Sequence, residues 1–85
     1  MSDLDAAFTQ ASEAVTSLAN DPGNEAKLSL YALYKQATSG DVSGKKPSRF
    51  DMVGRAKYEA WEKLAGTSSD DAKQRYVDLV RSLGG

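Results

Sequence analysis

A lysine and two tyrosines in the middle of this sequence form a group of side chains that could recognise a ligand. Lys35 lies one helical turn after Tyr31 and directly after Tyr34, so a helix would place a cation and phenol hydroxyls in one patch. Such a patch can stack an aromatic base and hold a phosphate. Aromatic residues at helical spacing are nevertheless more often core residues, and periodicity alone favours that interpretation.

A second lysine repeats the combination about twenty residues later. Lys57 precedes Tyr58 and lies four residues before Trp61, so it is a neighbour of that indole on a helix. The ordinary alternative is that the ammonium group of a single lysine is solvated while its aliphatic stem covers apolar surface. The pattern therefore suggests a site for an anionic, aromatic ligand without establishing one.

Catalysis and metal binding find little support among the remaining residues. The chain has no histidine and no cysteine, which removes the usual general base, thiol nucleophile and soft metal ligands. The hydroxyls of Thr67, Ser68 and Ser69 suit the start of a helix better than a nucleophile. Asp70 and Asp71 lack the alternating spacing of a calcium loop. We expect neither catalytic residues, nor a metal, nor a cofactor.

Charge is distributed unevenly along a chain whose net charge is -1. Residues 1–30 hold one base against five acids, a balance of -4, and residues 31–65 hold seven bases against four acids, a balance of +3. A basic centre in an acidic protein favours a localised anionic ligand over a long polyanion.

The length of 85 residues predicts a single domain, residues 1–85, held by packing alone because there is no cysteine. The longest apolar cluster, residues 28–34, is interrupted by Ser29 and is too short to span a bilayer. The N-terminus lacks the basic and apolar pattern of a signal peptide. These features predict a soluble cytoplasmic protein.

Two amphipathic helices are predicted in the first half. The apolar residues of the first recur at steps of four, three, four and three, at Leu4, Phe8, Ala11, Val15 and Leu18. It should begin with Ser2 or Asp3 as its cap and end at the break over residues 20–23. The second should have Asn24 as its cap and stop at Gly40, which can take the left-handed conformation. One side of it carries Leu28, Tyr31, Tyr34 and Lys35, with Lys27 beside them.

Two further helices follow a connection over residues 41–52, which contains Gly44 and Pro47 and has no helical period. The third should run from Met52 or Val53 to Ala65. The fourth should be capped by Ser68, with Asp71 reaching back as in a capping box, and should end at residues 84–85. Tyr76 lies in its apolar stripe. Four amphipathic helices predict an all-α bundle.

The order of residues in the centre of the chain resembles the signature of the acyl-CoA-binding protein family. The matching positions are Tyr31, Tyr34-Lys35-Gln36-Ala37-Thr38, Gly40-Asp41, Pro47, Asp51, Gly54, Ala56-Lys57-Tyr58 and Ala60-Trp61. Similarity extends over essentially the whole chain. The resemblance implies an up-down-down-up four-helix bundle with a long connection between helices two and three. It also implies that the protein is no enzyme, and binds medium- and long-chain acyl-CoA esters in a helical groove as an intracellular carrier and pool former.

The same resemblance assigns roles to individual residues. Tyr31 and Tyr34 would line the coenzyme A site, with Lys35 on the 3′-phosphate, Lys57 on the phosphates, and Tyr76 over the adenine and ribose. Leu28 and Tyr58 complete the implied ligand contacts. The partners implied are acyl-CoA and, transiently, enzymes that use it, for a monomer without nucleic acid or integral membrane association.

Four positions depart from the family pattern. Thr16 and Val53 stand where relatives often have bases, Tyr58 replaces a tryptophan, and Lys27 occupies a position that is often apolar. Lys27 would then replace a lost cation. Two other interpretations remain at this point: a helical protein-interaction adaptor without a lipid ligand, and a weak nucleic-acid binder acting through the basic centre.

Overall fold

The computed structural model describes residues 2–84, so Gly85, predicted to help end the fourth helix, lies outside the described residues. Four α-helices make up this part of the chain: α1 Asp3–Val15, α2 Asn24–Ser39, α3 Met52–Glu62 and α4 Ser69–Ser82. Residues 2–84 contain no strand. The predicted all-α class is confirmed.

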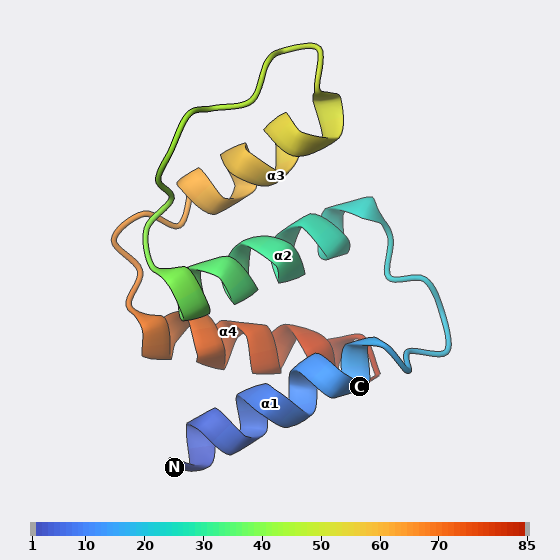
Figure 1. The fold of residues 1–85 in the computed structure, drawn as a ribbon. Helices are drawn as coiled ribbons and strands as arrows, with labels where there is room; N and C mark the ends of the chain where they lie inside the picture. Colours follow the sequence, from blue (N-terminus) through green and yellow to red (C-terminus); the bar gives the residue numbers. More distant parts are fainter. Residues whose placement is uncertain (1, 85) are drawn as a thin grey trace.

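The four helices lie side by side in the spatial order α1, α4, α2, α3, as Figure 1 shows. α1 and α4 run in one direction and α2 and α3 in the other, which confirms the predicted up-down-down-up topology. Residues 41–51, which we call the 41–51 connection, return along α3 to its start (Figure 1) and form the predicted long connection. The Cα extents of 37 × 29 × 15 Å describe a thin layer in which α3 forms one edge and packs on α2 alone among the helices.

The apolar core lies where α1, α2 and α4 meet. Its buried members come from these three helices: Phe8, Ala11, Leu30, Leu33, Ala37, Ala72, Tyr76, Val77 and Val80. Within the described chain, α3 contributes no buried residue. The edge helix must therefore be held by other contacts.

A buried glutamine supplies those contacts. Gln36 is 1% exposed, and its Nε2 donates to Asp41 Oδ1 and to the Thr67 carbonyl, both at 2.8 Å. Its Oε1 accepts from Trp61 Nε1 at 3.1 Å, and the same indole N–H donates to the Gly40 carbonyl at 2.8 Å. The end of α2 is thereby joined to the end of α3 and to the approach to α4, since a buried amide with satisfied partners strongly fixes its surroundings.

Two of the predicted helix caps are confirmed and one is wrong. Ser2 Oγ accepts from the Asp5 N–H and Ser68 Oγ accepts from the Asp71 N–H, each at 3.1 Å. The reciprocal bond of a capping box, from the Ser68 N–H to Asp71, is absent from the hydrogen bonds within residues 2–84. Asn24 is already helical; the cap of α2 is Gly23, with φ 91°.

Two predicted helix ends are also wrong, and for the same reason. α1 ends at Val15 rather than at the break over residues 20–23, and α3 ends at Glu62 rather than at Ala65. In both places the backbone tightens to i→i−3 hydrogen bonds, from Leu18 N–H to the Val15 carbonyl and from Ala65 N–H to the Glu62 carbonyl. Apolar spacing continues through such a turn, so it cannot locate the end of the α-helix.

Candidate functional site

A groove of about 350 Å³ opens between the first halves of α2 and α3. Its walls are formed by Asn24, Lys27, Leu28, Met52, Val53, Ala56 and Lys57. α3 diverges from α2 toward this end (Figure 1). The wall is apolar along most of its length and carries a lysine from each helix, which suits a ligand with both an apolar part and an anionic part.

Lys57 and Tyr31 face each other across the two helices. Lys57 Nζ lies 5.2 Å from the centroid of the Tyr31 ring, within the range of a cation–π contact. Lys57 is exposed and Tyr31 is half-buried. The structure therefore brings these two predicted site residues together, and Lys57 also forms part of the groove wall.

Lys35 and Trp61 form the reverse pair, with the cation on α2 and the ring on α3. Lys35 Nζ lies 5.2 Å from the centroid of the Trp61 ring. The ring is held by its indole N–H bonds to Gln36 and Gly40, so it is a fixed platform for the lysine. Among the ion pairs of residues 2–84, neither Lys35 nor Lys57 has a carboxylate partner. Both ammonium groups are free to meet an anion.

Tyr34 and Tyr76 belong to an aromatic cluster with Phe8. The Phe8 ring centroid lies 5.5 Å from that of Tyr34 and 5.1 Å from that of Tyr76, and the two tyrosine centroids are 6.0 Å apart. Tyr76 is 4% exposed while Tyr34 is 43% exposed. The interpretation of tyrosines as core residues is thus correct for Tyr76, whereas Tyr34 presents an open edge.

The Tyr76 hydroxyl remains available despite the burial of its ring. No hydrogen bond within residues 2–84 uses this hydroxyl, yet every fully buried side-chain oxygen or nitrogen there has a partner. The hydroxyl must therefore touch solvent. Burial, followed by the neighbouring Tyr34, raises the pKa of Tyr76 above 10.0, so it is a neutral donor and acceptor at physiological pH.

Lys27 lines the groove but is already paired. Its Nζ lies 3.0 Å from Asp21 Oδ2, and both side chains are well exposed. The Gly23 N–H, and then Lys27, lower the pKa of Asp21 by hydrogen bonding. Lys27 thus reaches the site as a partly neutralised cation.

Tyr58 differs from the other predicted site residues because its hydroxyl is in use. It donates to the Gly44 carbonyl at 3.2 Å. Lys46 Nζ and Arg55 Nε both contact Glu59 Oε1, at 3.3 and 3.1 Å. The contacts of Gly44 with Tyr58 and of Lys46 with Glu59 fasten the 41–51 connection along α3, whereas the Arg55–Glu59 pair lies within α3. Hydrogen bonds from Lys46 and then Arg55 lower the pKa of Glu59.

The two positions that depart from the family pattern by losing a base have different surroundings. Val53 forms part of the groove wall and makes that wall more apolar. Thr16 follows the last residue of α1, where its hydroxyl donates to the Glu13 carbonyl at 2.7 Å. Val53 therefore bears directly on the groove, whereas Thr16 has a local role at a helix end.

Sequence reasoning did not assign four residues of the groove wall to the site: Asn24, Met52, Val53 and Ala56. A signal for them exists in helical spacing. Residues 52, 53, 56 and 57 share one face of α3, and residues 24, 27 and 28 share one face of α2. The missing information was that these two faces are opposed.

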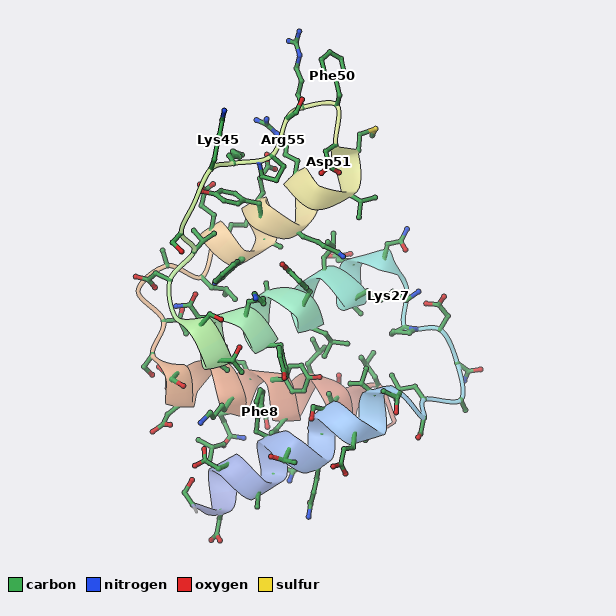
Figure 2. The ribbon with its side chains drawn as sticks, in the orientation of Figure 1. Phe8, Lys27, Lys45, Phe50, Asp51 and Arg55 are labelled. Atoms are coloured by element: carbon green, nitrogen blue, oxygen red, sulfur yellow. The ribbon has the colours of Figure 1, made fainter. Side chains whose placement is uncertain are left out.

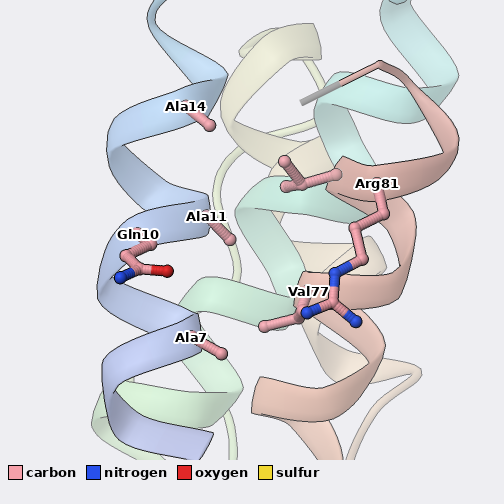
Figure 3. A pocket seen from close by; sticks show the side chains of 7 residues that line it. Ala7, Gln10, Ala11, Ala14, Val77 and Arg81 are labelled. Carbon is pink, nitrogen blue, oxygen red and sulfur yellow. The ribbon is translucent and has the colours of Figure 1, made fainter.

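A smaller cavity of about 150 Å³ lies between α1 and α4, where Figure 3 shows short side chains such as Ala7 and Ala11 facing Val77 and Arg81. It contains none of the predicted site residues. Residues 2–84 hold no group of three or more potential metal-ligating side chains, and none of their helices combines the length and apolarity needed to cross a membrane.

Comparison with known proteins gives matches over most of the chain. The family described as "Acyl CoA binding protein" matches residues 5–80. The acyl-CoA-binding protein of Saccharomyces cerevisiae is 47% identical over 76 residues, which cover 89% of this chain and 87% of that protein. The crystal structure of Oryza sativa acyl-CoA-binding protein 2 superposes with a TM-score of 0.89 at 38% identity, covering 94% of this chain and 89% of that one. Enoyl-CoA delta isomerase 2 of Rattus norvegicus is 53% identical over 76 residues, but the chain spans only 19% of that protein's length.

Proposed function

Since this chain belongs to the acyl-CoA-binding protein family, we propose that its groove binds medium- and long-chain acyl-coenzyme A esters. The observation that carries the proposal is the pair of crossed contacts beside an apolar groove, Lys57 on Tyr31 and Lys35 on Trp61. Two unpaired ammonium groups suit the phosphates of coenzyme A, and the apolar wall suits the acyl chain. The protein then acts as a carrier that keeps a pool of these esters in solution.

Each end of the ligand has a matching set of residues in this proposal. Lys35 pairs with the 3′-phosphate and Lys57 with the remaining phosphates. Tyr31 and Tyr34 flank the coenzyme A moiety, and the solvent-facing hydroxyl of Tyr76 contacts the adenine or ribose.

The acyl chain takes the apolar part of the groove. Leu28 on α2 and Val53 on α3 both line it, and Lys27 stands at its edge as an auxiliary cation. Tyr58 contributes its ring and, through Gly44, keeps the connection in place beside the site.

No reaction is proposed for the bound ester. The chain lacks histidine and cysteine, so its serine and threonine hydroxyls have no imidazole to activate them. The similarity to enoyl-CoA delta isomerase 2 covers a fifth of that protein, and the activity named there is not carried over. We place the carrier in the cytoplasm as a monomer that passes its ligand to enzymes that use acyl-CoA.

Calorimetric titration with free coenzyme A and with butyryl-, octanoyl-, dodecanoyl- and palmitoyl-CoA tests the proposal. Each methylene buried in the groove is worth up to about 0.8 kcal/mol, or roughly fourfold in affinity, until the groove is full. We therefore expect one saturable site whose dissociation constant falls with chain length. Equal affinity for all five ligands would reject the apolar groove, and absence of saturable binding would favour a protein-interaction adaptor instead.

A further inference from the structure

Three large apolar side chains stand out into solvent where the 41–51 connection enters α3. Phe50 is 83% exposed, Met52 79% and Val53 67%; we call these three residues the apolar tip. Figure 2 shows Phe50 at the far end of the molecule, pointing away from the helices. Scattered apolar residues on a surface are ordinary, but a cluster of this kind marks a contact site.

The backbone below the apolar tip is fixed by hydrogen bonds. The Asp51 N–H donates to the Ser48 carbonyl at 2.9 Å, and the Phe50 N–H donates to Ser48 Oγ at 3.2 Å. Asp51 Oδ1 then accepts from the Gly54 N–H at 3.0 Å and caps α3. The turn therefore presents Phe50 at its apex instead of folding the ring back onto the protein.

One free cation borders the apolar tip, and a second lies farther back on the same connection. Arg49 Cζ lies 5.2 Å from the centroid of the Phe50 ring, and Lys45 projects from the same connection in Figure 2. Both are exposed, and neither takes part in the ion pairs found within residues 2–84. Asp51 is the sole acid between residues 45 and 53, and its carboxylate is occupied as a helix cap.

We propose that the apolar tip, with Lys45 and Arg49, binds the surface of a bilayer containing anionic lipids. Apolar side chains that project beyond a basic rim can enter the headgroup region while the cations meet lipid phosphates. A stable protein–protein contact needs roughly 800 Å² from each partner, arranged around a packed centre. Three projecting side chains on a narrow turn suit insertion into the headgroup region, but they are too few to form the packed centre of a stable protein–protein contact.

The position of the apolar tip gives this contact a consequence. Met52 and Val53 belong both to the tip and to the wall of the groove. A bilayer that touches the tip would lie beside the groove, so the groove would be close to the acyl chains of the lipids. This consequence rests on the proposed function, whereas bilayer binding itself does not.

Sedimentation of the full chain, without acyl-CoA, with sucrose-loaded vesicles tests the proposal. We expect binding to phosphatidylcholine vesicles containing 30% phosphatidylserine, weak binding to phosphatidylcholine alone, and a decline as salt is raised. Phe50→Ser should weaken binding at least tenfold and Phe50→Leu should retain it, because burial of one large apolar side chain is worth about that factor or more.

A matched pair of charge reversals separates a local contact from general attraction. Arg49→Glu should weaken binding at least fivefold, since one cation near an anionic surface contributes about fivefold. Arg75→Glu makes the same change in net charge on α4, where Arg75 lines a different face, and should change binding by less than about twofold.

Three results would overturn the proposal. The first is a failure of the wild-type protein to sediment with anionic vesicles at millimolar lipid, which would indicate that the tip contacts another protein and not a bilayer. The others are equal losses for Arg49→Glu and Arg75→Glu, and full binding by Phe50→Ser. Calorimetry of the Phe50→Ser and Arg49→Glu variants with palmitoyl-CoA should give wild-type affinity, so failure of vesicle binding and failure of acyl-CoA binding are distinguishable.

Discussion

Replacement of Lys35 by methionine removes one ammonium group and keeps the stem that lies beside Trp61. Lys35 Nζ is 5.2 Å from the Trp61 ring centroid and has no carboxylate partner within the described chain. A charge-assisted bond from this group to a phosphate contributes roughly 1.5–3 kcal/mol, so Lys35→Met should weaken palmitoyl-CoA binding about ten- to hundredfold. Stability should change little, because a half-exposed cation–π contact is worth only about 0.5–1 kcal/mol.

The assignment of Lys35 to the 3′-phosphate is tested by changing the ligand as well as the protein. Wild type and Lys35→Met are titrated with palmitoyl-CoA and with its 3′-dephospho form in a calorimeter. If Lys35 contacts that phosphate, the substitution should have almost no effect with the dephospho ligand, because the two changes remove the same interaction. Trp61 fluorescence provides an independent readout, since Trp61 is the only tryptophan and lies under the lysine.

A control lysine removes the effect of net charge from this comparison. Lys63 follows the last residue of α3, is exposed, and lines, together with Arg75, a separate cavity that shares no residue with the groove. Lys63→Met should leave the affinity for palmitoyl-CoA within about twofold of wild type, as expected for a distant exposed charge at physiological salt. The reasoning fails if Lys35→Met weakens both ligands equally, or if Lys63→Met has the same effect as Lys35→Met.

Three further substitutions test other parts of the structure. Gln36→Leu removes hydrogen bonds to Asp41, Thr67 and Trp61 and should destabilise the fold by about 2–4 kcal/mol, lowering Tm by roughly 10–25 °C in calorimetry; an unchanged Tm would show that the network does not hold α3. Bonds from Gln36, and then from the Gly66 N–H, lower the pKa of Asp41 below 3.8, so its stabilisation is complete above the unfolded pKa and is lost as pH falls through the folded pKa. Asp41→Asn should therefore flatten the loss of stability below about pH 4 in urea titrations, and an identical acid dependence would contradict this. Lys27→Ala should weaken palmitoyl-CoA binding by only about three- to tenfold, because Asp21 already pairs with Lys27; calorimetry showing no change would exclude Lys27 as a replacement cation.

Local signals in the sequence predict much of the fold. Ser2 and Ser68 cap their helices as their residue types suggest, and the positive φ of Gly40 and Gly66 matches glycine at the end of a helix. The exact ends of α1 and α3 were mispredicted because the last turns keep apolar spacing while their hydrogen bonds change. The cap of α2 was mispredicted because Asp21 binds the Gly23 N–H and shifts the start by one residue.

The candidate site was predictable in its residue types and only partly in its geometry. Spacing places Tyr31 and Lys35 on one helix face, but the partner of each lysine lies on the other helix. Lys35 meets Trp61, 26 residues away, and Lys57 meets Tyr31. Such pairs depend on how α2 and α3 cross, which no local pattern specifies. Phe8 shows the same limit of local patterns. The apolar spacing of its helix predicts that Phe8 is buried, but it does not indicate that Phe8 contacts Tyr34 and Tyr76.

The way α3 is attached explains why a groove exists at all. A helix with no buried residue gains little from apolar packing, and α3 is held instead by the Trp61 indole at one end and by the Gln36 network. Polar contacts fix that end, while the other end, with Met52 and Val53, is left apolar and unfilled. Apolar area that the protein itself does not bury is available to a ligand, and its burial is favourable by about 25 cal/mol per Å². The incomplete packing of α3 is therefore the structural basis on which we propose that the groove holds an acyl chain.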